Sequence, residues 1–352
     1  DERMTERYGL YRENTETEER KQLLRRQKHQ ISMVGGACAA FWGVTMAVQI
    51  GLIMFLSVLR GFYGGGGSII GMEAATLLSS ISMYGVAYPV TAAMMLLIPR
   101  CGRPERGSLS LKEFGLCMVA AVGVGFAGNM IGSLAEFIKP GGTDTQIVEE
   151  MLQNSSLWSV MATTVFLAPV TEEYLYRKMI IDRLAGFGQG PAIFISAFMF
   201  GLAHGNFSQF FYAFGLGLMF GYVYAKTGRI GYTIAFHMIF NMLGGAIPLE
   251  LSRFSEGIIE GHFFLTWFQE ASGLDLTLFL RPAASLLILM YFFFQIAAFA
   301  GSILLLISYR KKIQLAPGQW PIKKGEYFKT ICLNPGMIVY LLICGGMFLL
   351  NW

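Results

Sequence analysis

Long apolar segments recur along the whole chain. The hydrocarbon core of a bilayer is about 30 Å thick, and a helix needs roughly 20 apolar residues to cross it. Inside that core the backbone must satisfy its own hydrogen bonds, so such segments form helices. Only 14% of the 352 residues are charged, against about 25% in soluble proteins. Nine segments have, or nearly have, the required length: 31–59, 69–98, 111–138, 155–180, 190–205, 208–226, 230–250, 283–308 and 337–352.

We therefore predict an all-α, polytopic integral membrane protein, folded as a helical bundle of about nine transmembrane helices. Residues 190–205 and 337–352 are short for a crossing, so a bundle of eight is the alternative. We recognise no signal peptide in the charged residues 1–30. The five cysteines have no C-x-x-C spacing. We expect them to be small apolar core residues rather than disulfides or metal ligands.

Basic residues are concentrated in alternate connections between these segments. Lysine and arginine accumulate on the cytoplasmic side of membrane proteins. We therefore predict a cytoplasmic amino terminus, an external carboxyl terminus and a place in the cell (plasma) membrane. The net charge of +4 follows from this orientation, and no basic, aromatic-interleaved face suggests a nucleic-acid partner. The basic residues are Arg20, Lys21, Arg25, Arg26 and Lys28 in the tail, then Arg100, Arg103, Arg106, Lys112, Lys178, Arg183, Lys226, Arg229, Arg310, Lys311, Lys312, Lys323, Lys324 and Lys329 in the even-numbered connections.

Four local patterns give more specific expectations. Gly64–Gly67 predicts a flexible connector, and Ile147–Leu152 predicts a short surface helix. Gly217 and Gly221 have the small-x-x-x-small spacing of closely packed membrane helices. The segment Glu250–Asp275 mixes aromatic and acidic residues, as in a helix that lies in the membrane interface. Its aromatic anchors are Phe263, Phe264, Trp267 and Phe268.

Charged residues occur inside the fourth apolar segment, in the sequence Thr171–Arg177. An ionisable side chain at mid-membrane costs about 3 kcal/mol and is retained mainly where it has a function or is neutralised. Glu173 and Arg177 are four residues apart, so they share one helical face and can form an ion pair. Glu172 points about 100° away from that pair. It is left as a free carboxylate, which is a candidate general base.

Three more polar residues lie in nearby apolar segments. His204 ends the sequence Phe200–His204, and His237 and Asn241 are four residues apart on one helical face. A lone histidine in an apolar helix is more often a satisfied core residue than a functional one. Two histidines, an asparagine and an unpaired glutamate in nearby helices favour a site. A carboxylate and an imidazole can activate water for attack on a carbonyl, and a second imidazole with an amide can stabilise the oxyanion.

The ordered set Glu172-Glu173-x-x-x-Arg177, Phe200-x-x-x-His204 and His237-x-x-x-Asn241 resembles the signature of the CPBP intramembrane proteases, also called the Abi or CAAX-protease family. The resemblance covers about residues 155–250. It implies an all-helical bundle with a catalytic cavity inside the membrane. It also implies that Glu172 and His204 activate water, that His237 and Asn241 form the oxyanion hole, and that Glu173, Arg177 and Phe200 support the site.

The resemblance divides the chain by role. We predict a charged cytoplasmic tail over residues 1–30, amino-terminal transmembrane helices over 31–150 and a catalytic core over 151–250. Residues 251–352 form a carboxyl-terminal interfacial segment with further transmembrane helices. The expected partners are the lipid bilayer, a peptide or membrane-protein substrate, and a membrane-protein partner for the helices outside the core.

The sequence leaves metal dependence and function open in part. Glu172, His204 and His237 are able to form a three-ligand zinc site. No H-E-x-x-H helix is present, however, and a ligating Glu172 would not easily serve as base. We favour hydrolysis without a cofactor and keep zinc as the alternative. The rival functions are a non-catalytic membrane scaffold or immunity protein and an ion or proton transporter. Transport is disfavoured because the polar groups form one cluster rather than a path across the bilayer.

Overall fold

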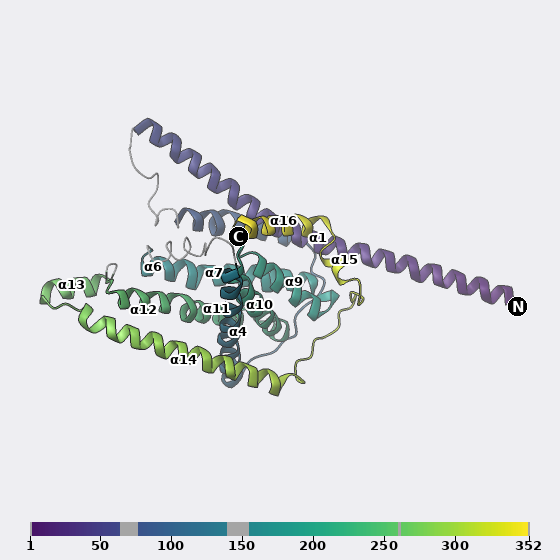
Figure 1. Ribbon diagram of the computed structural model, residues 1–352. Coiled ribbons are helices and arrows are strands. Elements are labelled where there is room, and N and C mark those ends of the chain that lie inside the picture. The colour runs from purple at the N-terminus through teal and green to yellow at the C-terminus, as the bar shows by residue number, and fades with distance from the viewer. Residues whose placement is uncertain (1, 64–76, 139–154, 260–261, 351–352) are drawn as a thin grey trace.

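The computed structural model describes residues 2–63, 77–138, 155–259 and 262–350. These residues form helices and the connections between them, with no strand among them, so the predicted all-α membrane bundle is confirmed (Figure 1). The elements are α1 (Glu2–Tyr63), η1 (Ile81–Ala87), α3 (Tyr88–Leu96), α4 (Leu111–Ile138), α6 (Leu157–Val160), η2 (Met161–Leu167), α7 (Ala168–Glu172), η3 (Glu173–Ile181), α8 (Asp182–Leu184), η4 (Ala185–Phe187), α9 (Gln189–Leu202), α10 (Phe207–Thr227), α11 (Ile230–Asn241), η5 (Met242–Ala246), α12 (Ile247–Glu256), α13 (Phe263–Ser272), α14 (Thr277–Tyr309), α15 (Tyr327–Ile331) and α16 (Pro335–Leu350).

Each of the nine apolar segments is helical over most of its described residues; residues 97–98, 155–156 and 203–205, at segment ends, lie outside the helices. Within the described residues, five helical stretches are long and apolar enough to cross a membrane, and α9 and α16 are shorter apolar helices. These two are the short segments that left eight crossings as the alternative to nine. The number of crossings therefore stays a prediction. The five long stretches are Glu18–Leu59, Leu77–Leu96, Leu111–Ile138, Ile230–Glu256 and Thr277–Tyr309.

Glycines bring the central helices into close contact. A Cβ on Gly217 would lie 2.8 Å from the Cα of Ala197, and a Cβ on Gly221 would lie 3.0 Å from the side chain of Ile193. Both neighbours belong to α9, so the predicted close packing at the two glycines of α10 is confirmed. On α4, a Cβ on Gly132 would meet the backbone of Ser208. These contacts hold α10 between α4 and α9.

Several connections predicted to be cytoplasmic lie together at one end of the bundle. The backbone N–H of Cys101 donates to the carbonyl of Asp182 (3.2 Å), and that of Trp320 donates to Gly186 (2.8 Å). Gln27 of α1 donates its side-chain amide to the carbonyl of Trp320 (2.9 Å). One end of the bundle therefore holds the amino-terminal tail and the three connections that contain Cys101, Gly186 and Trp320.

The turn between α10 and α11 belongs to the same end. Glu105 donates its backbone N–H to the carbonyl of Ala225 (2.9 Å), and its carboxylate accepts from Lys226 (2.8 Å) and Gln189 (3.1 Å). Lys226 and then Gln189 hold the pKa of Glu105 below its ordinary value. Four connections and the tail are therefore interlocked.

The segment Glu250–Asp275 is not one helix. α12 ends at Glu256, where Gly257 adopts a left-handed conformation (φ 82°), and α13 begins at Phe263. On α13, Phe264, Trp267 and Phe268 are exposed, as an interfacial helix requires. The expectations for Gly64–Gly67 and Ile147–Leu152 lie outside the described residues. All five cysteines are free; Cys38 and Cys344 are buried, and the other three are half-buried.

Candidate active site

The helix that carries Glu172 and Glu173 changes its winding beside them. Pro169 lacks an N–H and its ring would clash with the preceding turn of a regular α-helix. The preceding residues of η2 widen into a π-helical turn, in which the N–H of Ala168 reaches the carbonyl of Thr163. A second π-helical stretch, η3, begins at Glu173. Such stretches are frequent at functional sites.

Glu173 lies between Arg177 and His237. Its Oε2 is 3.1 Å from Nε of Arg177, and both side chains are fully buried. This contact confirms the ion pair predicted from the four-residue spacing. Its Oε1 is 2.8 Å from Nδ1 of His237, which lies 64 residues further along the chain. Because an ionised carboxylate only accepts hydrogen bonds, Nδ1 of His237 carries the proton.

Arg177 is balanced by aromatic rings as well as by Glu173. Its guanidinium lies 4.3 Å from the centre of the Phe200 ring and 5.8 Å from that of Phe220. A cation above a ring face in a desolvated site gains about 2 kcal/mol. The ion pair and the rings together compensate for burying this charge.

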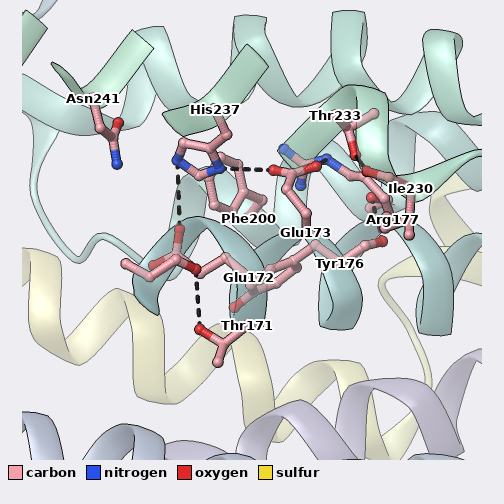
Figure 2. Close-up of polar contacts among 12 residues, drawn as sticks. Thr171, Glu172, Glu173, Tyr176, Arg177, Phe200, Ile230, Thr233, His237 and Asn241 are labelled. Atoms are coloured by element: carbon pink, nitrogen blue, oxygen red, sulfur yellow. Dashed lines mark hydrogen bonds and ion pairs between the residues drawn. The ribbon is translucent and has the colours of Figure 1, made fainter. Parts of the chain in front are cut away.

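Glu172 faces the other nitrogen of the same imidazole. Its Oε2 is 3.8 Å from Nε2 of His237, and its side chain is 25% exposed where that of Glu173 is 0%. Figure 2 shows the imidazole of His237 between the two carboxylates. A separation of 3.8 Å is longer than a hydrogen bond. Glu172 and Nε2 of His237 are therefore not hydrogen-bonded to each other.

His204 lies in the turn that follows α9 and is oriented by the last turn of that helix. Its Nδ1 lies 2.9 Å from the carbonyl oxygen of Phe200. A carbonyl only accepts, so Nδ1 carries the proton and Nε2 of the neutral imidazole is left as an acceptor. The Phe200 ring is 5.0 Å from the His204 ring and 5.8 Å from the His237 ring. Among the described contacts none joins His204 to Glu172, so their cooperation stays a prediction.

Asn241 lies one helical turn beyond His237 on α11 and is labelled with it in Figure 2. Its Nδ2 donates to the carbonyl of Thr164 in η2 (2.9 Å). A carboxamide nitrogen carries two hydrogens, so one N–H is left to donate elsewhere. The Thr164 carbonyl in η2 therefore orients the Asn241 amide, as Glu173 orients the His237 imidazole.

The three residues of the zinc alternative do not converge. Within the described ranges, no three His, Cys, Asp or Glu side chains are grouped so that they could hold a metal ion. Glu172 approaches Nε2 of His237, but no described contact joins His204 to either residue, although its Nε2 is left free by the bond of Nδ1 to a backbone carbonyl. This arrangement does not fit a three-ligand zinc centre, and the cofactor requirement stays a prediction.

Sequence reasoning missed the link between Glu173 and His237. Local spacing identifies partners within one helix, but this contact joins η3 to α11 and depends on how the helices pack. It also missed a second polar cluster, which is centred on Glu250 in the first turn of α12. There Glu250 accepts from Arg253 (2.7 Å) and from His262 (2.7 Å), and Arg253 also donates to the carbonyl of Ser155 (2.6 Å).

Comparison with known proteins supports a protease. Residues 154–243, roughly a quarter of the chain, match the family model described as "type II CAAX prenyl endopeptidase Rce1-like". The chain carries an Rce1-like domain. This domain contains every residue of the candidate site, from Thr164 to Asn241, and the match supports a membrane-protease function.

Two curated relatives match part of the chain. The membrane-embedded CAAX protease MroQ of Staphylococcus aureus (strain USA300) is 26% identical in an alignment of 174 residues that covers 44% of this chain and 69% of that protein. The putative membrane peptidase YdiL of Bacillus subtilis (strain 168) is 26% identical in an alignment of 134 residues that covers 36% of this chain and 53% of that protein. The second match thus spans about half of the relative's length. No solved structure matches the chain.

Proposed function

We propose that this protein is an intramembrane endopeptidase that hydrolyses peptide bonds in a peptide or membrane-associated protein. One observation carries the proposal. Within an Rce1-like domain, the partly exposed carboxylate of Glu172 lies 3.8 Å from an imidazole whose other nitrogen is fixed by a buried carboxylate. A carboxylate that can act as a base and an oriented imidazole are the groups that hydrolysis of an amide requires.

In the proposed reaction Glu172 acts as the general base. It accepts a proton from water while the water oxygen bonds to the carbonyl carbon of the scissile peptide. His204, whose Nε2 is an acceptor, orients or shares that proton. The tetrahedral intermediate then collapses, the C–N bond breaks, and the proton passes to the leaving amine.

His237 and Asn241 supply hydrogen bonds to the oxyanion. Asn241 donates the N–H that Thr164 does not use. His237 donates from Nε2 only when both of its ring nitrogens are protonated. Two carboxylates flank that imidazolium, and with Arg177 the group of Glu172, Glu173, Arg177 and His237 has no net charge. Because the group carries no net charge, burying the charged imidazole costs less free energy than burying an unpaired charge.

Cleavage assays with Glu172→Gln test the proposal. The purified protein in lipid vesicles is given a quenched-fluorescent peptide library. We expect Glu172→Gln to lower kcat/KM by about 10²–10⁴-fold, the usual effect of losing a general base. Glu113→Gln is the matched control, because Glu113 is exposed and caps α4 through Ser110, a role that glutamine also fills.

A chelator is added to each sample. Unchanged wild-type cleavage supports metal-free hydrolysis, whereas loss that zinc restores would establish a metalloprotease. Equal cleavage by wild type and Glu172→Gln would refute this site. A Glu172→Gln variant that folds and retains full biological function would instead support the scaffold or immunity role.

A further inference from the structure

Tyr212 of α10 lies among the candidate catalytic residues, although no motif includes it. Its ring is 6.3 Å from the His204 ring at an interplanar angle of 69°. On its other side it is 6.1 Å from the ring of Phe240, the neighbour of Asn241. Tyr212 therefore lies between His204 and α11, the helix that carries His237 and Asn241.

Close packing holds the backbone of Tyr212 in place. A Cβ on Gly128 of α4 would overlap the backbone N and Cα of Tyr212, so the two helices touch there without an intervening side chain. One turn away, a Cβ on Gly132 would meet the backbone of Ser208 in the same manner. A donor fixed in this way needs little reorganisation when charge develops near it, which is the condition for effective stabilisation.

The hydroxyl of Tyr212 is not engaged. Buried tyrosine hydroxyls normally find a partner: Tyr224 donates to Asp182 (2.8 Å) and Tyr340 to the carbonyl of Met199 (2.6 Å), and the half-buried Tyr291 donates to that of Leu243 (2.7 Å). For the half-buried Tyr212, the described part of the chain contains no hydrogen bond to the hydroxyl. Its O–H remains available to a bound molecule.

We propose that the Tyr212 hydroxyl donates a hydrogen bond to the oxyanion of the tetrahedral intermediate. The inference rests on the proposed protease function. As the water oxygen bonds to the carbonyl carbon, the electron pair of the C=O bond moves onto oxygen, and Tyr212 donates to that oxygen. When the C–N bond breaks, the pair returns and the proton stays on Tyr212. This donor is neutral, whereas donation from Nε2 of His237 needs a charged ring.

Tyr212→Phe removes only the hydroxyl. We expect kcat to fall about 10²–10³-fold, as for the loss of one oxyanion donor, with KM and the unfolding midpoint unchanged. Binding of a phosphinate peptide, whose tetrahedral oxyanion imitates the intermediate, should weaken by a similar factor, while binding of the substrate peptide should not. Tyr222→Phe, on the same helix, is the matched control and should change neither quantity.

Full kcat in Tyr212→Phe, or substrate and phosphinate binding weakened equally, would overturn the inference. If Glu172→Gln abolishes cleavage and Tyr212→Phe does not, only this inference fails; if Glu172→Gln cleaves normally, the proposed function itself fails. Should the wild type cleave no peptide offered, phosphinate affinity decides. The phosphinate affinity of Glu172→Gln is then compared with that of the Glu172→Gln/Tyr212→Phe double variant. Weaker binding by the double variant supports the Tyr212 donor, and equal binding refutes it.

Discussion

Glu173 links the stability of the buried core to the geometry of the candidate site. One oxygen neutralises Arg177 and the other accepts from His237. Glu173 and Arg177 are both fully buried, so neither has water as a substitute partner. Removing one partner of a buried pair leaves the other charge uncompensated. The same residue thus serves folding and the orientation of the imidazole, and its two roles can be separated.

We expect Glu173→Gln to lower the free energy of unfolding by about 3–5 kcal/mol, because Arg177 is left without its counter-charge. Replacing both partners with neutral residues, as in Glu173→Gln/Arg177→Met, should recover most of that loss. Protease activity should remain low, because glutamine does not hold the imidazole of His237 as a carboxylate does. Thermal unfolding and peptide cleavage are measured on the same samples. A double variant with wild-type activity would show that Glu173 does not position His237.

At the scale of helices, prolines determine where the winding changes. Three π-helical turns come directly before a proline at the second residue of the next α-helix: η1 before Pro89, η2 before Pro169 and η5 before Pro248. Each proline lacks a donor, and a widened turn relieves the clash of its ring. η2 supplies the carbonyl of Thr164 that holds Asn241. A proline four residues before Glu173 therefore shapes the site.

The contact between α4 and α10 gives a prediction for a single glycine. A Cβ at Gly132 would lie 2.6 Å from the carbonyl oxygen of Ser208 and 2.9 Å from its Cα. These are backbone atoms, so the helices must separate. We expect Gly132→Ala to destabilise the protein by about 1–3 kcal/mol, the usual cost of overpacking.

The control is Gly115→Ala on the same helix, where an added Cβ has no neighbour within 4 Å. Alanine is the better helix former by about 1 kcal/mol, so this variant should be neutral or more stable. Thermal unfolding midpoints in one detergent compare the two. Equal midpoints would contradict the close approach of α4 to α10.

For the whole molecule, the sequence was informative about spacing within segments and silent about contacts between them. Apolar length predicted helices, and the four-residue spacing of Glu173 and Arg177 predicted their ion pair, because helical geometry fixes both. The partner of Asn241 lies 77 residues earlier in the chain. Such a contact depends on the depth and rotation of each helix, which interhelical packing decides and hydropathy does not specify.

At the interlocked end of the bundle, the Rce1-like domain is in contact with the rest of the chain. Trp320 donates its backbone N–H to Gly186 and accepts from Gln27 through its carbonyl, and its ring lies 4.2 Å from the guanidinium carbon of Arg26. Residues before and after the domain thus cover the same end of its helices. The domain is packed as part of a larger bundle.

This shared end leads to a prediction of orientation. Lysine and arginine are retained on the cytoplasmic side, and the exposed Lys312 belongs to the basic end, whereas the exposed Glu270 follows the aromatic residues of α13 at the other. Cells expressing Lys312→Cys or Glu270→Cys are treated with a membrane-impermeant maleimide, and wild-type labelling of the native cysteines is subtracted. We expect Glu270→Cys to be labelled in intact cells and Lys312→Cys only after permeabilisation. The reverse pattern would invert the bundle. Labelling of both variants in intact cells would place α13 and the α14–α15 connection on the same side of the membrane. That result would contradict a single crossing by α14, which puts its two ends on opposite sides.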